Sequence, residues 1–185
     1  MSTPQGAIRL NMDSQRLEFF AEGRWHEMAT DVPTLDGGAR GIIGSGLSIP
    51  GGSGATNIDF ITIPTQGNAT AFGSLSYGNA YRGGLASNTR GIFVNGQNDQ
   101  TTEFITISHT GTVTSFGEIT NDNMGGATFS NQIKGFRAGG SDGGTHTNEI
   151  IAMTIATTSS FFDFGDTTTN MGYTAGCSDS HGGLS

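Results

Sequence analysis

Histidine and cysteine are the residues of this chain that could hold a transition metal or carry nucleophilic and proton-transfer chemistry. The sequence contains four histidines and one cysteine: His26, His109, His146, His181 and Cys177. Cys177 and His181 have ligand-like spacing, but no other histidine or cysteine lies near them to complete a four-ligand site. We therefore predict no metal site and no cofactor within one chain. One alternative is an ion held on the axis of a trimer by three copies of His109 or His146.

Two other groups of side chains could support hydrolysis. The run Asp179-Ser180-His181 has the residue types of a catalytic triad, but consecutive residues do not converge in the geometry that a triad needs. Asp163 and Asp166 could act as paired carboxylates in glycan hydrolysis, although carboxylates at strand ends are usually solvated. Glycine-rich stretches such as residues 51–54 lack the lysine and the helix start of a phosphate loop. We predict that the protein is not an enzyme.

The charge balance restricts the partners. Eight basic and 16 acidic residues give a net charge of −8, which argues against nucleic acid and anionic membrane surfaces, because affinity for phosphates comes from clustered Lys and Arg. Apolar runs of four or five residues are too short for membrane insertion. Residues 1–6 lack the features of a signal peptide. A single cysteine excludes an intrachain disulfide.

The composition predicts that strands and turns position the polar groups. Glycine supplies 31 of 185 residues, well above the usual share of about 7%, and charged residues supply only 13%. Gly, Thr, Ser and Asn favour turns and strands over helices. No stretch of ten residues shows the apolar period of a helix. We predict an all-β fold.

A repeat of about 44 to 50 residues organises the chain after residue 38. Its first signature is a basic residue followed by glycine, at Arg40-Gly41, Arg90-Gly91, Lys134-Gly135 and His181-Gly182. Its second signature is a pair of positions 12 residues apart, at Phe60 and Phe72, Phe104 and Phe116, and Ala152 and Phe164. Self-similarity at such a period indicates a repeat architecture. The repeats are 39–89, 90–133 and 134–180, and residues 181–185 form the start of another.

Each repeat is expected to form four short strands, called a to d. In the first repeat the strands are residues 40–44, 58–63, 69–75 and 83–86. In the third repeat, strand d is expected at Tyr173–Cys177. Because no helix separates the strands, we expect antiparallel meanders rather than parallel βαβ units.

Matching positions in the repeats predict the core. The aromatic residue of strand c and the last isoleucine of strand b should face inward: Phe72, Phe116, Phe164, Ile63, Ile107 and Ile155. The third repeat departs from the pattern, with Thr158-Ser159-Ser160 at the turn and Ala152 in place of an aromatic residue. We expect its packing to be the weakest.

Residues 1–29 read as a separate β-hairpin module, joined to the repeats by a linker at 30–38. Period-two alternation predicts three short strands with one apolar face, made by Ile8, Leu10, Leu17, Phe19 and Trp25. So few residues form a marginal unit in water. We therefore expect this module to need a partner, either the repeats or another chain.

The loops between strands a and b are candidates for binding. Their lengths differ among the repeats, whereas the spacing of strands b and c is constant. Insertions confined to one class of loop lie on one face of a repeat protein, often the binding face. The candidate residues have side chains suited to sugar hydroxyls: Asn57, Gln97, Asn98, Asp99, His146 and Asn148. The alternative is that they belong to surface loops without a ligand.

Two resemblances suggest a biological role. The segments Gly6-x-Ile8-Arg9, Leu17-Glu18-Phe19-Phe20 and Gly23-Arg24-Trp25 resemble a small β module of bacteriophage tail-fibre and other virion proteins. The glycine-rich repeats resemble degenerate kelch repeats, and nearly the whole chain resembles kelch-like virion structural proteins of marine bacteriophages, especially cyanophages. This resemblance implies a virion location, contacts with other virion proteins, and a non-enzymatic tail-fibre or appendage protein that self-assembles and touches host surface glycans. The alternatives are a glycan depolymerase, a carbohydrate-binding module and a capsid decoration protein.

The number of repeats predicts self-association. Three repeats are fewer than the roughly four to eight blades of a closed β-propeller. Either several chains share a ring, or the repeats stack around a fibre axis as a trimeric prism. We expect a homo-oligomer, with a trimer favoured and a six-blade dimer as the alternative. The extra strand at 181–185 is expected to add to the edge at Tyr173–Cys177 or to a neighbouring subunit.

Overall fold

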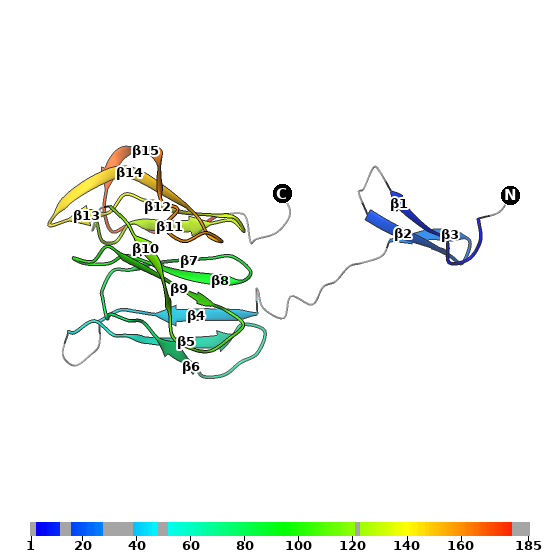
Figure 1. Ribbon diagram of the computed structural model, residues 1–185, viewed down its shortest axis with the longest axis horizontal. Coiled ribbons are helices and arrows are strands. Elements are labelled where there is room, and N and C mark those ends of the chain that lie inside the picture. Colours follow the sequence, from blue (N-terminus) through cyan, green and yellow to red (C-terminus); the bar gives the residue numbers. More distant parts are fainter. Residues whose placement is uncertain (1–2, 12–15, 28–38, 48–51, 121–122, 179–185) are drawn as a thin grey trace. The chain divides into compact units, whose positions relative to one another are not determined.

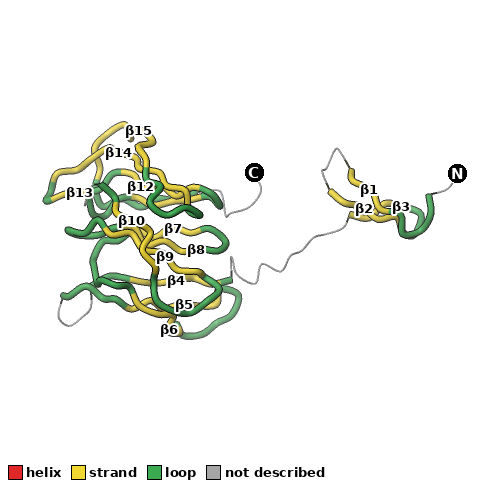
Figure 2. Tube along the Cα trace, viewed as in Figure 1, coloured by secondary structure: helices red, strands yellow, loops and turns green. Residues whose placement is uncertain are grey.

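The computed structural model describes residues 3–11, 16–27, 39–47, 52–120 and 123–178. The chain divides into two compact units, Met1–Thr34 and Leu35–Ser185, so the division falls inside the expected linker. All the regular structure in the described residues is β-structure, and every strand pair is antiparallel (Figures 1 and 2). The all-β prediction is confirmed. Within the described ranges, no helix has the length and apolar character needed to cross a bilayer.

The first unit is a three-stranded sheet. Its strands are β1 (Ile8–Asn11), β2 (Arg16–Ala21) and β3 (Arg24–Glu27), in the order β1-β2-β3. The turn between β2 and β3 has two central residues, Glu22 and Gly23, and both have positive φ. Such a two-residue turn fixes the register of a hairpin, because its backbone twist matches that of the strands.

That register corrects the expected position of Trp25. Trp25 lies opposite Phe20, and therefore on the face away from Phe19. The guanidinium of Arg9 lies 4.2 Å from the centre of the indole ring on this second face. His26 instead pairs with Phe19, and their rings stack at 5.4 Å. The other apolar residues share one face as expected, because Ile8 pairs with Phe19 and Leu10 pairs with Leu17.

The described residues of the second unit form three sheets. The first sheet has β4 (Arg40–Gly44), β5 (Asn57–Thr62) and β6 (Thr70–Ser74). The second has β7 (Gly83–Ala86), β8 (Arg90–Val94), β9 (Thr101–Thr106) and β10 (Thr114–Glu118). The third has β11 (Ala127–Ser130), β12 (Lys134–Ala138), β13 (Ser141–Asp142), β14 (Thr145–Thr154) and β15 (Phe162–Met171).

The sheets are out of phase with the sequence repeats by one strand. The expected strand d of each of the first two repeats, β7 or β11, pairs with strand a of the next repeat, β8 or β12. The reason is the length of the connections. Residues 87–89 form a tight turn in which the N–H of Ser87 donates to the carbonyl of Arg90 at 2.9 Å. Residues 75–82, in contrast, are long enough to cross from the first sheet to the second.

The expected strand d of the third repeat is not a strand in the structure, although residues 173–178 are described. The expected strand at 181–185 lies outside the described residues. Strand β13 was not expected, and β14 and β15, at the expected strands b and c of this repeat, are ten residues long, about twice the length of β9 and β10. The third sheet is therefore the one that differs most from the repeat pattern.

The three sheets stack face to face, with the second sheet in the middle (Figure 1). One core lies between the first and second sheets and contains Ile58, Phe72, Leu75, Phe93 and Ile105. The other lies between the second and third sheets and contains Leu85, Ile92, Val94, Phe116, Ile119, Ile151, Met153 and Ile155. The predicted burial of Phe72, Phe116, Ile107 and Ile155 is confirmed.

The predicted burial of Ile63 and Phe164 is wrong. Ile63 is 59% exposed and Phe164 is 56% exposed. The cause is their position in the stack. Residues equivalent to Ile63 pack on the preceding sheet, and residues equivalent to Phe164 pack on the following one. Among the described residues of this unit, no sheet precedes the first and none follows the third.

Truncation of the repeated phenylalanines should separate the inner positions from the outer one. Phe72→Ala and Phe116→Ala should each lower the free energy of unfolding by about 3–5 kcal/mol, because each removes a fully buried ring. In a single, unassociated chain, Phe164→Ala should lower the free energy of unfolding by well under half as much, because Phe164 is 56% exposed. Urea denaturation at submicromolar concentration, followed by circular dichroism, measures all three. Equal losses at Phe116 and Phe164 would contradict the assignment of inner and outer faces.

Candidate functional site

A pocket with a volume of about 290 Å³ lies where two a–b loops meet the crossover from the first sheet to the second. The loop after β4, the turn after β8 and the crossover at residues 75–82 supply its lining, which is uncharged: Leu47, Gly52, Gly54, Tyr77, Gly78, Asn79, Ala80, Gln97 and Asn98. Tyr77 is 62% exposed, so its ring is available to a ligand. Two of the six predicted binding residues, Gln97 and Asn98, therefore lie in one pocket.

Backbone contact between two loops forms one wall of the pocket. A Cβ atom on Gly54 would lie 2.2 Å from the carbonyl carbon of Gly78, and one on Gly78 would lie 2.1 Å from the carbonyl oxygen of Gly54. Glycine is required at both positions, because no side chain fits between the two backbones. The N–H of Gly46 donates to the carbonyl of Asn79 at 3.0 Å, and the hydroxyl of Ser45 donates to the same carbonyl. These contacts fix the first loop against the crossover.

A buried ion-pair network lies behind the pocket. The guanidinium of Arg82, whose side chain is 1% exposed, donates to Asp99 Oδ2 at 2.7 Å and to Glu103 Oε2 at 3.3 Å. Glu103 also accepts from the backbone N–H of Ser76 at 3.2 Å. The side-chain amide of Asn79 donates to the carbonyl of Gln97 at 3.0 Å and to Asp99 at 3.3 Å. The network therefore joins the crossover to the β8–β9 turn that carries Gln97 and Asn98.

Asp99 is an ionised member of this network. Burial raises the pKa of the Asp99 carboxyl, but hydrogen bonds from Thr101, the charge of Arg82 and a hydrogen bond from Asn79 outweigh burial, and the net pKa lies below its usual range. Asp99 is thus ionised at neutral pH and held by Arg82. Of the three predicted residues in this turn, Gln97 and Asn98 are exposed and Asp99 faces the network.

The other three predicted residues lie elsewhere. Asn57 begins β5 and pairs with Ser74 of β6, outside the pocket. His146 and Asn148 lie on β14 of the third sheet. The ring of His146 makes an edge-to-face contact with Tyr173 at 6.2 Å. The six residues are therefore not one site.

Sequence reasoning missed the crossover. Tyr77, Asn79 and Arg82 build much of the pocket and its support, yet they lie between strands c and d, where no difference in loop length drew attention. The sequence does contain one signal for this segment. A tyrosine stands among residues that favour turns, in Ser76-Tyr77-Gly78-Asn79, and an aromatic residue in a turn is often at the surface.

The described side chains do not converge on metal or carboxylate chemistry at this pocket. Across the described ranges, no group of three or more His, Cys, Asp or Glu side chains could hold a metal ion. Asp163 and Asp166 are exposed on β15, and Asp163 Oδ1 accepts from the N–H of Gly165 at 2.9 Å. Asp179, Ser180 and His181 lie outside the described residues.

No protein-family model and no curated protein sequence matches the chain. Among the solved structures that resemble it is one described as "Structure of YjhT", with a TM-score of 0.59 at 9% sequence identity. The match covers 83% of this chain and 59% of that chain, so this chain spans less than two thirds of the matched structure. At this identity the likeness is one of fold.

Replacing Arg82 tests the ion-pair network. Arg82→Met leaves two partly or fully buried carboxylates unpaired and should cost about 3–5 kcal/mol of unfolding free energy. The triple variant Arg82→Met, Asp99→Asn, Glu103→Gln should recover part of that loss, because no buried charge is left without a partner. Urea denaturation at pH 7 measures both. A triple variant that is less stable than Arg82→Met would show that packing, not unpaired charge, dominates.

Asp99 should also make the free energy of unfolding depend on pH in the acid range. Its pKa is lower in the folded chain than in the unfolded chain, so the unfolded state binds more protons as the pH falls through this range. The contribution is complete above the unfolded pKa of about 3.9 and is lost as the pH falls through the folded pKa. Asp99→Asn should flatten the decline in the unfolding free energy below about pH 4. Asp142→Asn, at an exposed position of β13 outside the network, is the matched control, and an identical decline in Asp99→Asn and the unchanged chain would contradict the assignment.

Proposed function

We propose that the protein is a non-enzymatic structural protein of a bacteriophage virion, in a tail fibre or another surface appendage, and that it contacts neutral glycans of the host surface. The observation that carries this proposal is the division into a small sheet with an apolar face and a larger unit with an uncharged pocket built from loops. The small sheet attaches the chain to another virion protein, and the larger unit is displayed.

The first unit supports the attachment role. Its strands contain the residues that resemble the β module of virion proteins. Ile8 and Leu10 of β1, with Leu17 and Phe19 of β2, are exposed on one face of the sheet. An exposed apolar face on so small a unit favours binding to another surface.

The uncharged pocket supports contact with sugars. An exposed tyrosine ring can pack on the apolar face of a sugar, and the amides of Gln97 and Asn98 can donate to and accept from hydroxyl groups. None of the described residues that line the pocket is charged, which favours a neutral glycan over an acidic one. The net charge of −8 acts in the same direction.

A glycan depolymerase is the alternative from another functional class. Hydrolysis of a glycosidic bond needs two carboxyl groups on either side of the bond. Asp99, the carboxylate that follows the pocket residue Asn98 in the chain, is held by Arg82 behind the lining. This arrangement supports binding without cleavage.

Binding and turnover are tested with the same samples. The full chain should slow in affinity electrophoresis through gels that contain a neutral host polysaccharide, and it should release no fragments from that polysaccharide. Tyr77→Ala and Gln97→Ala should weaken retardation at least fivefold, whereas Asn57→Ala, an exposed amide outside the pocket, should not. Release of more than one fragment per chain would overturn the non-enzymatic assignment.

Location on the virion needs a separate measurement. Antibodies against the second unit should label surface appendages of intact phage particles in immunogold electron microscopy. Labelling confined to infected cells, with none on purified particles, would contradict the virion role and leave the pocket assignment to the binding assay.

A further inference from the structure

We propose that two copies of the second unit associate head to tail, and that residues 174–178 of one copy become the fourth strand of the first sheet of the other. In this arrangement the outer face of the third sheet packs on the outer face of the partner copy's first sheet. The inference goes beyond the proposed function, because it concerns how copies of this chain join and does not depend on a virion or a glycan.

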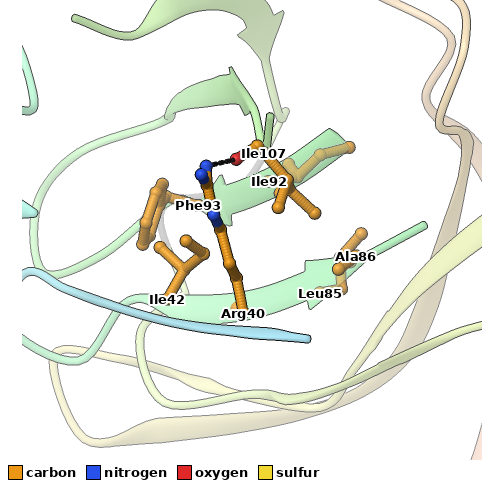
Figure 3. Close-up of a pocket in the computed structure, with 9 residues that line it drawn as sticks. Arg40, Ile42, Leu85, Ala86, Ile92, Phe93 and Ile107 are labelled. Atoms are coloured by element: carbon orange, nitrogen blue, oxygen red, sulfur yellow. Dashed lines mark hydrogen bonds between the residues drawn. The ribbon is translucent and has the colours of Figure 1, made fainter. Parts of the chain in front are cut away.

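The first observation is a vacant strand position. The structure has an open pocket of about 350 Å³ between β4 and β7 (Figure 3). Strand β7 covers the edge of β8, and β11 covers the edge of β12, but no strand in the described residues covers the same edge of β4. The pocket lies beside this edge, where β4 contributes Arg40 and Ile42 and β7 contributes residues 84–86. A further strand along β4 would fill the pocket and satisfy the edge.

Residues 174–178 lie on the far side of β11, in the position that the missing edge strand of a partner copy's first sheet would occupy. Strand β11 packs on β7 with two side-chain bonds, from Thr128 Oγ1 to the carbonyl of Gly84 at 2.9 Å and from Ser130 Oγ to that of Ala86 at 2.7 Å. The segment at 174–178 packs on β11 in the same way, and Ser178 Oγ donates to the carbonyl of Ser130 at 2.7 Å. This segment therefore occupies the position that β7 and β11 have in their sheets, one step further along the stack.

The backbone continues the same series before that segment. The N–H of Gly125 donates to the carbonyl of Tyr81 at 3.1 Å, and the N–H of Thr174 donates to the carbonyl of Gly125 at 3.0 Å. The rings of Tyr81 and Tyr173 also meet, at 5.8 Å. The chain thus has three segments in equivalent positions, and two of them, β7 and β11, already form an edge strand of a sheet.

The outer faces have the residues of an inner interface. On the first sheet and at its edge, Ile43, Ile61 and Ile63 are exposed. The equivalent Phe93 and Ile105 of the second sheet are buried against the first, and the equivalent Ile107 is also buried. On the third sheet, Phe164 is exposed, although Phe72 and Phe116 are buried under the next sheet. Phe164 contacts Phe136 edge to face at 5.0 Å, and Phe136 stacks on Phe129, so the third sheet offers an aromatic surface. Each outer face therefore matches the surface that the other one requires.

Polar contacts between sheets also form a series with one member missing. The guanidinium of Arg40 donates to the carbonyl of Ile107 at 2.6 Å, and that of Arg90 donates to the carbonyl of Ile155 at 2.9 Å. The next pair in the series is the ammonium of Lys134 and the carbonyl of Ile63 in a second copy. Lys134 Nζ now lies 5.5 Å from the centre of the Phe162 ring.

The turns between strands b and c also make equivalent hydrogen bonds from one sheet to the next. The N–H of Gly111 donates to the carbonyl of Phe72 at 2.9 Å, and the N–H of Ser159 donates to that of Phe116 at 2.6 Å. Gly67 holds the equivalent turn position in the first repeat, and Phe164 holds the equivalent carbonyl in the third. A second copy would bring these two together.

Head-to-tail contact closes with two copies. The outer face of the third sheet and the outer face of the first sheet are different surfaces, so their contact is heterologous and must close into a ring to avoid an open filament. If each sheet is one blade, two copies supply six blades and three copies would supply nine. Known β-propellers have roughly four to eight blades. The inference therefore favours a dimer of this unit over the trimer expected from the sequence.

The register of the added strand follows from the pairs inside the chain. Leu85 pairs with Ile92, and Phe129 pairs with Phe136. Ser178 makes the bond that Ser130 makes, so Cys177 corresponds to Phe129. Ile42 corresponds to Ile92 and Phe136, because each follows a basic residue and glycine. Cys177 of one copy should therefore lie opposite Ile42 of the other.

Disulfide trapping in the full chain tests this register. Directly opposed residues in antiparallel strands have Cα atoms about 4.5–5.5 Å apart, which suits a disulfide. Ile42→Cys, with the native Cys177, should form a covalent dimer under mild oxidation, seen on a non-reducing gel. The unchanged chain, and Ile42→Cys with Cys177→Ser, should form at least tenfold less.

A second experiment places a charge on the outer face of the third sheet. Phe164→Glu in the Ile42→Cys background should reduce trapping at least tenfold while leaving the circular dichroism spectrum unchanged, since Phe164 is exposed in the single chain. Thr120→Glu, at an exposed position outside both outer faces, should leave trapping unchanged. No covalent dimer, or equal trapping in the Phe164→Glu variant, would overturn the proposal. A disulfide within one chain would overturn it as well, because the chain would then close on itself.

Discussion

Sheets can stack only as closely as the atoms between them allow, and in this protein backbone meets backbone. A Cβ atom on Gly73 would lie 1.7 Å from the carbonyl oxygen of Gly111, and one on Gly117 would lie 3.2 Å from the Cα atom of Ser159. These glycines let the b–c turn of the next sheet reach the strand c carbonyl of Phe72 or Phe116 and donate to it. The burial of the two apolar cores and the position of each following strand depend on this approach.

The sequence was sufficient to predict strands and their repeated core positions, because alternation and periodicity are local properties. It was not sufficient to predict which repeated positions are buried. Ile63 and Ile107 have the same place in their repeats, but burial depends on whether a sheet lies on that side, and only one of them has such a neighbour. Trp25 shows the same limit at a smaller scale, since its face depends on the length of the turn at Glu22 and Gly23.

The pocket was predictable in part for a related reason. Variable loop length pointed to Gln97 and Asn98, because insertions in a repeat protein collect on one face. The crossover that completes the pocket follows no such pattern. Its position comes from Arg82, which reaches two carboxylates 17 and 21 residues away in the sequence, and no local pattern indicates that contact.

The mismatch between sequence repeats and sheets has a consequence for folding cooperativity. In many repeat proteins each repeat is a complete structural unit, and stability is close to a sum of unit and interface terms. Here the last strand of one repeat belongs to the sheet of the next, so opening one repeat also removes a strand from its neighbour. Partial unfolding then costs more than one interface. The three sheets should therefore open as a single unit rather than fray one at a time from either end of the stack.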